Sequence, residues 1–142
     1  MKIKLLNNLA KIPTKGSKEA AGYDLYAATD YDIEIQPSQT VKVDTGIAMA
    51  IPDGYFGAIF ARSGLATKQG LRPANCVGVV DSDYRGPVIV ALHNDSERTQ
   101  VISAGDRIAQ LVILPYKTEL LEIVDELDDT ERGEGGFGST GK

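Results

Sequence analysis

The stretch GIAMAIPDGYFGAIF, residues 46–60, decides the fold class. It contains two mainly apolar runs, 46–51 and 55–60, separated by a Pro-Asp-Gly tripeptide at 52–54. Proline presets a turn angle, aspartate can bond its own backbone and glycine accepts a left-handed conformation, so the tripeptide favours a tight turn. Short apolar runs bounded by such turns are typical of β-strands. We therefore predict two strands joined by a turn.

The same alternation of short runs and turns continues along the chain. Turn residues also gather at 36–38, 85–86 and 104–106. The predicted strands are residues 2–6, 31–35, 40–43, 46–51, 55–60, 76–80, 88–92, 107–114 and 120–124. Only residues 64–69, GLATKQ, favour a short helix, and no long segment with helical periodicity supports a βαβ fold. The sequence predicts an all-β sandwich or barrel with one short helix.

Composition narrows the class of protein and of partner. The 142 residues predict a single domain, and the net charge of −5 disfavours a surface that coats nucleic acid. The one cysteine, Cys76, has no partner for an intrachain disulfide, which favours a reducing compartment. The N-terminal MKIKLLNNLAKI contains no apolar run long enough for a signal peptide or a membrane span. We expect a cytoplasmic protein that binds neither membrane nor nucleic acid.

Two predicted strands, CVGVV at 76–80 and VIVAL at 88–92, are apolar on both faces. A strand with one solvated face would alternate apolar and polar residues. Either both strands are central in a two-layer sandwich, or a second subunit covers one of their faces. The first interpretation is the starting point, and the small size of the domain makes an oligomer an expectation as well.

The segment ARSGLATKQGL, residues 61–71, has the residue types of an anion site. Arg62 offers a fork of donors, Ser63 adds a hydroxyl, and Gly64 permits close approach to backbone amides at a helix start. The alternative is a capped surface turn with an exposed arginine.

The segment GVVDSDYRG, residues 78–86, predicts a strand followed by a turn. Asp81 emerges directly from the apolar run, and burial there would make its carboxylate a better base. The alternative is a solvated turn with acidic residues at its tip.

Two further polar residues interrupt apolar stretches. Asp24 lies in AGYDLYA and Gln110 lies in GDRIAQLVI. Each is a candidate site residue, and each has a structural alternative. Asp24 would then be a carboxylate satisfied within the fold, and Gln110 a core hydrogen-bonding or outward-facing side chain.

The C-terminal RGEGGFGSTGK, residues 132–142, contains glycine patterns typical of phosphate loops, but no helix follows them. Five glycines favour a mobile tail. Phe137 indicates more than a linker, because a lid that closes over a ligand needs an aromatic face to stack on a base. We expect a β domain at 1–131 and a flexible lid at 132–142.

Taken in this order, AGYDLYA, ARSGLATKQGL, GVVDSDYRG, GDRIAQLVI and RGEGGFGSTG resemble the five motifs of the homotrimeric deoxyuridine triphosphate nucleotidohydrolases, or dUTPases. The resemblance implies a jelly-roll-like β fold and a homotrimer with active sites shared between subunits. It also implies hydrolysis of dUTP to dUMP and pyrophosphate with Mg²⁺. That reaction limits the incorporation of uracil into DNA and supplies dUMP for thymidylate synthesis.

The resemblance also implies roles for individual residues of the body. Asp81 would orient and deprotonate the attacking water, with help from Gln110, and Tyr84 would pack under the deoxyribose. Asp24 would contact the water shell of Mg²⁺, whose direct ligands come from the triphosphate. The remaining substrate-binding residues of the body would be Arg62, Ser63 and Gly64 for phosphate, and Asn75, Gly78, Val79 and Val80 for uracil.

In the tail, the resemblance implies that Phe137 stacks on uracil. The residues of the lid that would accompany it are Arg132, Gly138, Ser139 and Thr140.

Three alternatives remain open at this point. A dCTP deaminase shares the fold, but the catalytic glutamate of that family corresponds to Ala91 in PVIVALHN. A non-catalytic interaction protein would keep the fold and use it to bind a partner. A zinc enzyme is disfavoured, because Cys76 and His93 show no ligand spacing and Cys76 is interpreted as a small buried residue.

Overall fold

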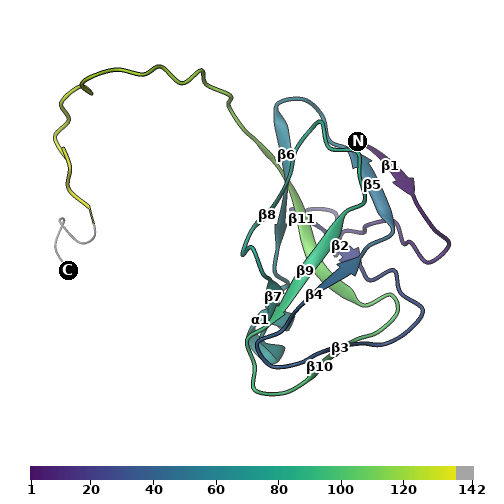
Figure 1. Cartoon of the computed structure of the whole chain (residues 1–142). Coiled ribbons are helices and arrows are strands. Elements are labelled where there is room, and N and C mark those ends of the chain that lie inside the picture. Colours follow the sequence, from purple (N-terminus) through teal and green to yellow (C-terminus); the bar gives the residue numbers. More distant parts are fainter. Residues whose placement is uncertain (137–142) are drawn as a thin grey trace.

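The computed structural model describes residues 1–136 of the chain. Over this range it consists of short strands and one helix (Figure 1). In chain order they are β1 (Lys2–Leu5), β2 (Gly22–Tyr26), β3 (Ile33–Ile35), β4 (Thr40–Asp44), β5 (Ile47–Ala50), β6 (Tyr55–Phe60), α1 (Ser63–Gln69), β7 (Leu71–Pro73), β8 (Gly78–Val80), β9 (Ile89–Asn94), β10 (Gln100–Ile102) and β11 (Arg107–Pro115). The predicted all-β class is confirmed.

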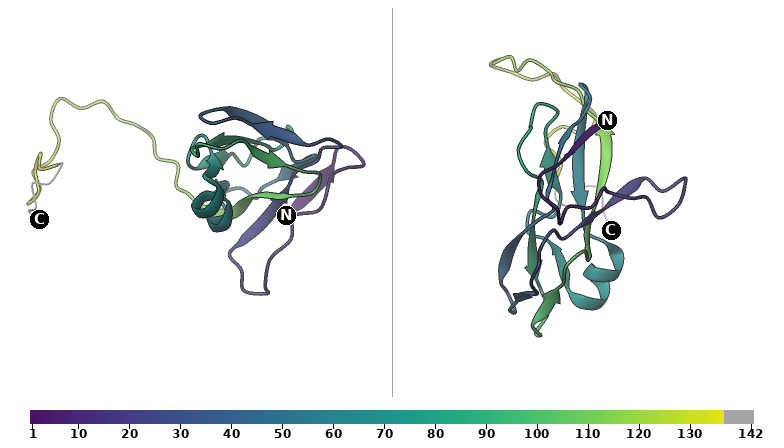
Figure 2. Two further views of the ribbon diagram at one scale, coloured as in Figure 1. Left: turned by 90° about the horizontal axis from the view of Figure 1, so that it is seen from below. Right: turned by 90° about the vertical axis from the view of Figure 1, so that its right-hand side faces the viewer.

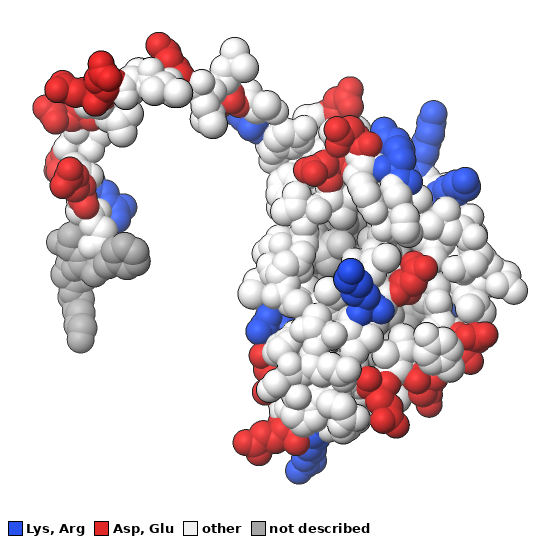
Figure 3. Space-filling view, in the orientation of Figure 1, with Lys and Arg blue, Asp and Glu red and all other residues white. Residues whose placement is uncertain are grey.

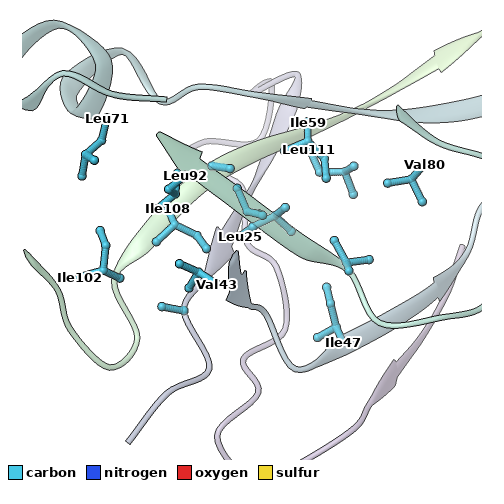
Figure 4. Close-up of a cluster of buried hydrophobic side chains, with 14 of the residues drawn as sticks. Leu25, Val43, Ile47, Ile59, Leu71, Val80, Leu92, Ile102, Ile108 and Leu111 are labelled. Atoms are coloured by element: carbon cyan, nitrogen blue, oxygen red, sulfur yellow. The ribbon is translucent and has the colours of Figure 1, made fainter. Parts of the chain in front are cut away.

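The strands form antiparallel sheets that stay open and do not close into a barrel. The larger ones have the orders β2-β11-β6-β8 and β4-β9-β7, and β1-β5 and β10-β3 form two-stranded sheets. Leu25 and Leu111 of the first sheet and Val43 and Leu92 of the second meet in one buried core (Figure 4). This arrangement is compatible with a jelly-roll-like sandwich, and the helix lies at one end of the body (Figure 2).

The turn predicted at 52–54 is present, and it connects strands that belong to two different sheets. The Tyr55 amide donates to the Pro52 carbonyl at 3.2 Å, and Gly54 has a φ of 78°. Strand β5 pairs with β1, whereas β6 pairs with β11 and β8. The two predicted strands are therefore confirmed, although they belong to different sheets.

The predicted strand at 120–124 is wrong for the described chain. Residues 117–136 contain no strand and extend away from the body beyond β11 (Figures 1 and 2). Leu120, Leu121 and Ile123 are 97–101% exposed, because no neighbouring strand among the described residues supplies backbone partners or an apolar face. Strands β2, β7 and β10 were not expected from the sequence.

The two doubly apolar runs differ from the starting expectation. Strand β8 lies at the edge of its sheet, and its Val79 is 62% exposed. Strand β9 is central in its sheet, yet Ile89 on its outer face is 44% exposed. One face of each run is therefore uncovered in the single chain, so the central-strand interpretation is wrong for β8.

No helix among residues 1–136 is long and apolar enough to cross a membrane. Acidic side chains gather along the extended segment 117–136 (Figure 3).

Candidate functional site

A pocket of about 230 Å³ opens beside β8. It is lined by Ile59, Asn75, Gly78, Val79, Val80, Asp81, Tyr84, Pro87, Val88 and Ile89. The structure thus brings the predicted uracil and deoxyribose residues of the body together with the candidate catalytic base, Asp81.

The edge position of β8 gives this pocket its hydrogen-bonding capacity. Strand β8 pairs with β6 on one side only, so within the described residues its other edge presents unpaired backbone donors and acceptors. A Cβ at Gly78 would lie 3.1 Å from Ile59 Cβ and 3.2 Å from Asn75 Nδ2. The absence of a side chain at Gly78 therefore lets the Asn75 amide lie against the strand.

Tyr84 forms a wall of the same pocket. Its hydroxyl donates to the Pro87 carbonyl at 3.1 Å. A Cβ at Gly86 would lie 2.5 Å from Tyr84 Oη and 2.7 Å from Cζ. The ring is therefore seated directly over Gly86 and held by its hydroxyl, which fixes the width of the pocket at this point.

Asp81 is exposed in the single chain. Besides the main pocket it borders a second hollow, lined also by Phe56, Val79 and Tyr116. The burial expected from its place after an apolar strand is thus not provided by this chain alone, because β8 is an edge strand with an uncovered outer face.

A second group of predicted residues surrounds Asp24. Nε of Arg62 donates to Asp24 Oδ1 at 2.9 Å, and Nη1 of Arg107 donates to Oδ2 at 3.2 Å. Nη1 of Arg62 also donates to the Arg107 carbonyl at 3.2 Å. The Asp24 side chain is only 14% exposed, so two cations and one anion share a partly buried cluster. The cluster carries a net positive charge and can attract an anion.

Backbone geometry explains how this cluster forms. Arg62 is the N-cap residue of α1 and makes no side-chain cap, which leaves its guanidinium available for Asp24. Gln110 is opposite Asp24 in the pairing of β11 with β2, and its Nε2 donates to the Ala61 carbonyl at 3.1 Å. Ser63 and Gly64 form the exposed start of the helix.

Arg107 was missed by the sequence reasoning. It lies in GDRIAQLVI beside Gln110, and its position at the start of β11 was the available signal.

Within one chain the two groups lie apart. Asp81 follows Val80, which pairs with Gly57, so Asp81 lies near Phe56. Gln110 pairs with Phe60, at the other end of β6. Four residues of strand correspond to about 13 Å. The chain therefore does not bring Asp81 next to Gln110 or the arginine cluster.

A family model for dUTPase matches residues 8–141. The chain belongs to the dUTPase family. It is similar to the deoxyuridine 5'-triphosphate nucleotidohydrolase of Syntrophotalea carbinolica, with 48% identity over 99% of this chain and 96% of the relative. The corresponding protein of Desulfitobacterium hafniense is 51% identical over 92% of this chain and 87% of its own length.

Solved dUTPase structures share the fold. The dUTPase of Staphylococcus bacteriophage 80alpha with dUPNHPP superposes with a TM-score of 0.87 at 31% identity, covering 99% of this chain and 98% of that one. The dUTPase of phage phi11 of S. aureus gives 0.82 at 28% identity, covering 91% and 98%.

The tail of this dUTPase family member is only partly described. Arg132 is exposed, and its Nε donates to the Gly135 carbonyl at 2.8 Å. The other predicted lid residues, Phe137, Gly138, Ser139 and Thr140, lie outside the described residues.

Two further observations concern metal and thiol chemistry. Among residues 1–136, no group of three His, Cys, Asp or Glu side chains is arranged to hold a metal ion. Cys76 is exposed, so the expectation of a buried small residue is wrong. It has a left-handed φ of 61° in the turn that leads into β8.

Proposed function

We propose that the chain hydrolyses dUTP to dUMP and pyrophosphate by attack of water on the α-phosphorus. The observation that supports the proposal is the main pocket beside β8, which is lined by the residues proposed for uracil, for the sugar and for proton abstraction in this member of the dUTPase family. The reaction limits uracil incorporation into DNA and supplies dUMP for thymidylate synthesis. We place it in the cytoplasm.

The uracil and the deoxyribose of the substrate bind in this pocket. The free edge of β8 and the Asn75 amide hydrogen-bond the uracil, and Tyr84 packs under the deoxyribose so that a 2'-hydroxyl meets the ring. Uracil and cytosine present different donors and acceptors, and a site built for one rejects the other by roughly 10⁴-fold.

Asp81 and Gln110 position and activate the attacking water. Asp81 orients it and accepts its proton, and Gln110 helps to hold it near the α-phosphorus. Alignment of the water by Asp81 contributes to the rate alongside acceptance of its proton.

The phosphates bind at the start of α1, through Arg62, Ser63 and Gly64. Both oxygens of Asp24 already accept from arginines, and each keeps a further lone pair for a water molecule. The two Asp24 oxygens therefore fit an Mg²⁺ ion that they would contact through its water shell, while the triphosphate would supply the direct ligands. The ion would neutralise charge on the phosphates during the reaction.

The site is completed in a homotrimer. The separation of Asp81 from the arginine cluster, and the uncovered Val79 and Ile89, support a site to which one subunit contributes the β8 pocket and another the cluster. Residues 132–142 act as a lid beyond the β domain at 1–131. Phe137 stacks on uracil, and the remaining lid residues grip the phosphates: Arg132, Gly138, Ser139 and Thr140.

The test is release of pyrophosphate from dUTP, dCTP, dTTP and UTP with Mg²⁺. Release from dUTP, with at most trace release from the others, is expected. No release from any nucleotide, or equal release from all four, would contradict the proposal.

A further inference from the structure

Arg72 and Asp95 form a two-pronged ion pair outside the residues assigned so far. Nε of Arg72 donates to Asp95 Oδ2 at 2.5 Å, and Nη2 donates to Oδ1 at 3.0 Å. The hydrogen bond with Asp95 raises the pKa of the Arg72 guanidinium from its ordinary value, so the group stays cationic. The two side chains are 35% and 45% exposed, and a pair this exposed adds little to stability.

Asp95 is held by a rigid part of the fold. Its amide donates to the Gly70 carbonyl at 2.8 Å, at the end of α1. The preceding Asn94 is fully buried, and its side-chain amide donates to the carbonyls of Ile35 and Arg98. Nε2 of His93 lies 3.4 Å from Asp95 Oδ1. Asp95 is therefore an anchor, and Arg72 is the group it orients.

The third nitrogen of Arg72 faces the turn that leads into β8. Nη1 lies 3.3 Å from the Pro73 carbonyl oxygen, 3.5 Å from that of Ala74 and 3.6 Å from Cys76 Sγ. The Cys76 amide also donates to the Pro73 carbonyl at 3.0 Å. Cys76 has a φ of 61°, a conformation that costs energy for a residue with a side chain. The guanidinium thus contacts three parts of this turn, the carbonyls of Pro73 and Ala74 and the thiol of Cys76.

Asn75 lies at the centre of this turn and lines the pocket. Its carbonyl accepts from the Val77 amide at 2.6 Å, and the space above Gly78 receives its side-chain amide. The direction of that amide therefore depends on the turn keeping its shape.

We propose that Arg72, oriented by Asp95, is a positioning residue that holds the turn around Asn75 in the shape required to recognise the base. This inference rests on the proposed function and deepens it. The pair contacts neither the cluster of Asp24, Arg62 and Arg107 nor Asp81. It therefore affects the binding and selection of uracil rather than the attack of water.

The test compares Arg72→Gln, Arg72→Lys and Asp95→Asn with the wild-type chain and with Arg98→Gln. Arg98 is the matched control, because its guanidinium has no hydrogen-bond partner within residues 1–136. Arg72→Gln and Asp95→Asn should raise the KM for dUTP about tenfold and lower the dUTP-to-dCTP ratio of kcat/KM about tenfold, since each breaks charge-assisted hydrogen bonds. Arg72→Lys, with its charge but without the fork, should recover part of the loss.

A purely structural role predicts a different result. Loss of folded protein lowers the apparent kcat but changes neither the KM nor the selectivity of the molecules that remain folded. Unchanged KM and selectivity in the Arg72 and Asp95 variants would therefore overturn the inference. Absence of dUTP hydrolysis by the wild-type chain would instead overturn the proposed function.

A double variant tests the route through Asn75. If Arg72 acts by positioning Asn75, then Arg72→Gln combined with Asn75→Ala should have the KM of Asn75→Ala alone. A further increase of about tenfold in the double variant would show independent effects and contradict the inference.

Discussion

Nε of Arg62 donates to Asp24 Oδ1 over 2.9 Å and joins the start of α1 to strand β2. Because Arg107 takes the other carboxylate oxygen, Asp24 fixes the orientation of two guanidinium groups at once. The group has one carboxylate for two cations, so positive charge remains at the place proposed for the triphosphate. In the proposed site, the Asp24 carboxylate would both orient the arginines that bind phosphate and accept hydrogen bonds from the water shell of Mg²⁺.

Replacing Asp24 by Asn should separate these contributions. The amide keeps the shape of the side chain but loses its charge, so the Mg²⁺ concentration for half-maximal dUTP hydrolysis should rise about tenfold. The free energy of unfolding should fall by about 1 kcal/mol, since the cluster is only partly buried. A Mg²⁺ titration of pyrophosphate release measures the first effect. A lower rate with an unchanged Mg²⁺ requirement would contradict it, and the exposed Asp32→Asn serves as control.

Asp81→Asn should abolish catalysis without disturbing the fold. The side chain is exposed, so the melting temperature should stay close to that of the wild type. Loss of the proton acceptor should lower kcat by about 10² to 10⁴ while dUTP still binds. Asp83→Asn is the matched control, because this neighbour is exposed and does not line the pocket. If the Asp81→Asn protein keeps its activity, Asp81 is not the proton acceptor for the attacking water.

The part of the candidate site that could be predicted from the sequence consists of residues that lie close together along the chain. One strand and its flanking turns carry the predicted residues that line the main pocket: Asn75, Gly78, Val79, Val80, Asp81 and Tyr84. The pairing of Asp24 with Arg107 was not predictable, since it depends on the register of β2 against β11 and on a register shift between Arg107 and Ala109. Pattern within a segment indicates which residues are special, but strand register decides which of them meet.

The errors in the fold have the same origin. Leu120, Ile123 and their neighbours have the composition of a strand, but a strand needs a partner for its backbone, and none lies beside them among the described residues. Strand β2 was missed for the opposite reason. Gly22 and Asp24 disfavour a strand locally, yet β11 supplies partners along its length.

Activity should return when two inactive variants share a trimer. In the proposed shared site, Asp81→Asn would remove the catalytic base contributed by one subunit, and Arg62→Gln the phosphate-binding guanidinium contributed by another. Co-refolded mixtures should contain sites with both native residues and hydrolyse dUTP faster than either variant alone. The measurement is pyrophosphate release per milligram after co-refolding. Mixtures no more active than the separate variants would argue for sites formed within one chain.

Gly86→Ala should weaken discrimination by the sugar. A Cβ at this position would lie 2.5 Å from Tyr84 Oη, so the ring must move. Displacement of the ring should raise the KM for dUTP and lower the preference for dUTP over UTP about tenfold, since the proposed packing of Tyr84 against the deoxyribose would be lost. Gly16→Ala is the control, because nothing lies within 4 Å of its added Cβ. The kinetics of dUTP and UTP hydrolysis measure the effect, and an unchanged ratio would remove Tyr84 from sugar selection.

Deletion of residues 133–142 should leave a folded but inactive protein. Residues 117–136 contribute no strand to the body, and the residues of the core precede them, so the melting temperature and the oligomeric mass should not change. Loss of the proposed lid removes the stacking of Phe137 and the phosphate contacts, which should lower kcat/KM for dUTP about 100-fold or more. Deletion of Lys142 alone is the matched control. Full activity of the longer deletion would show that the β8 pocket and the arginine cluster suffice without a lid.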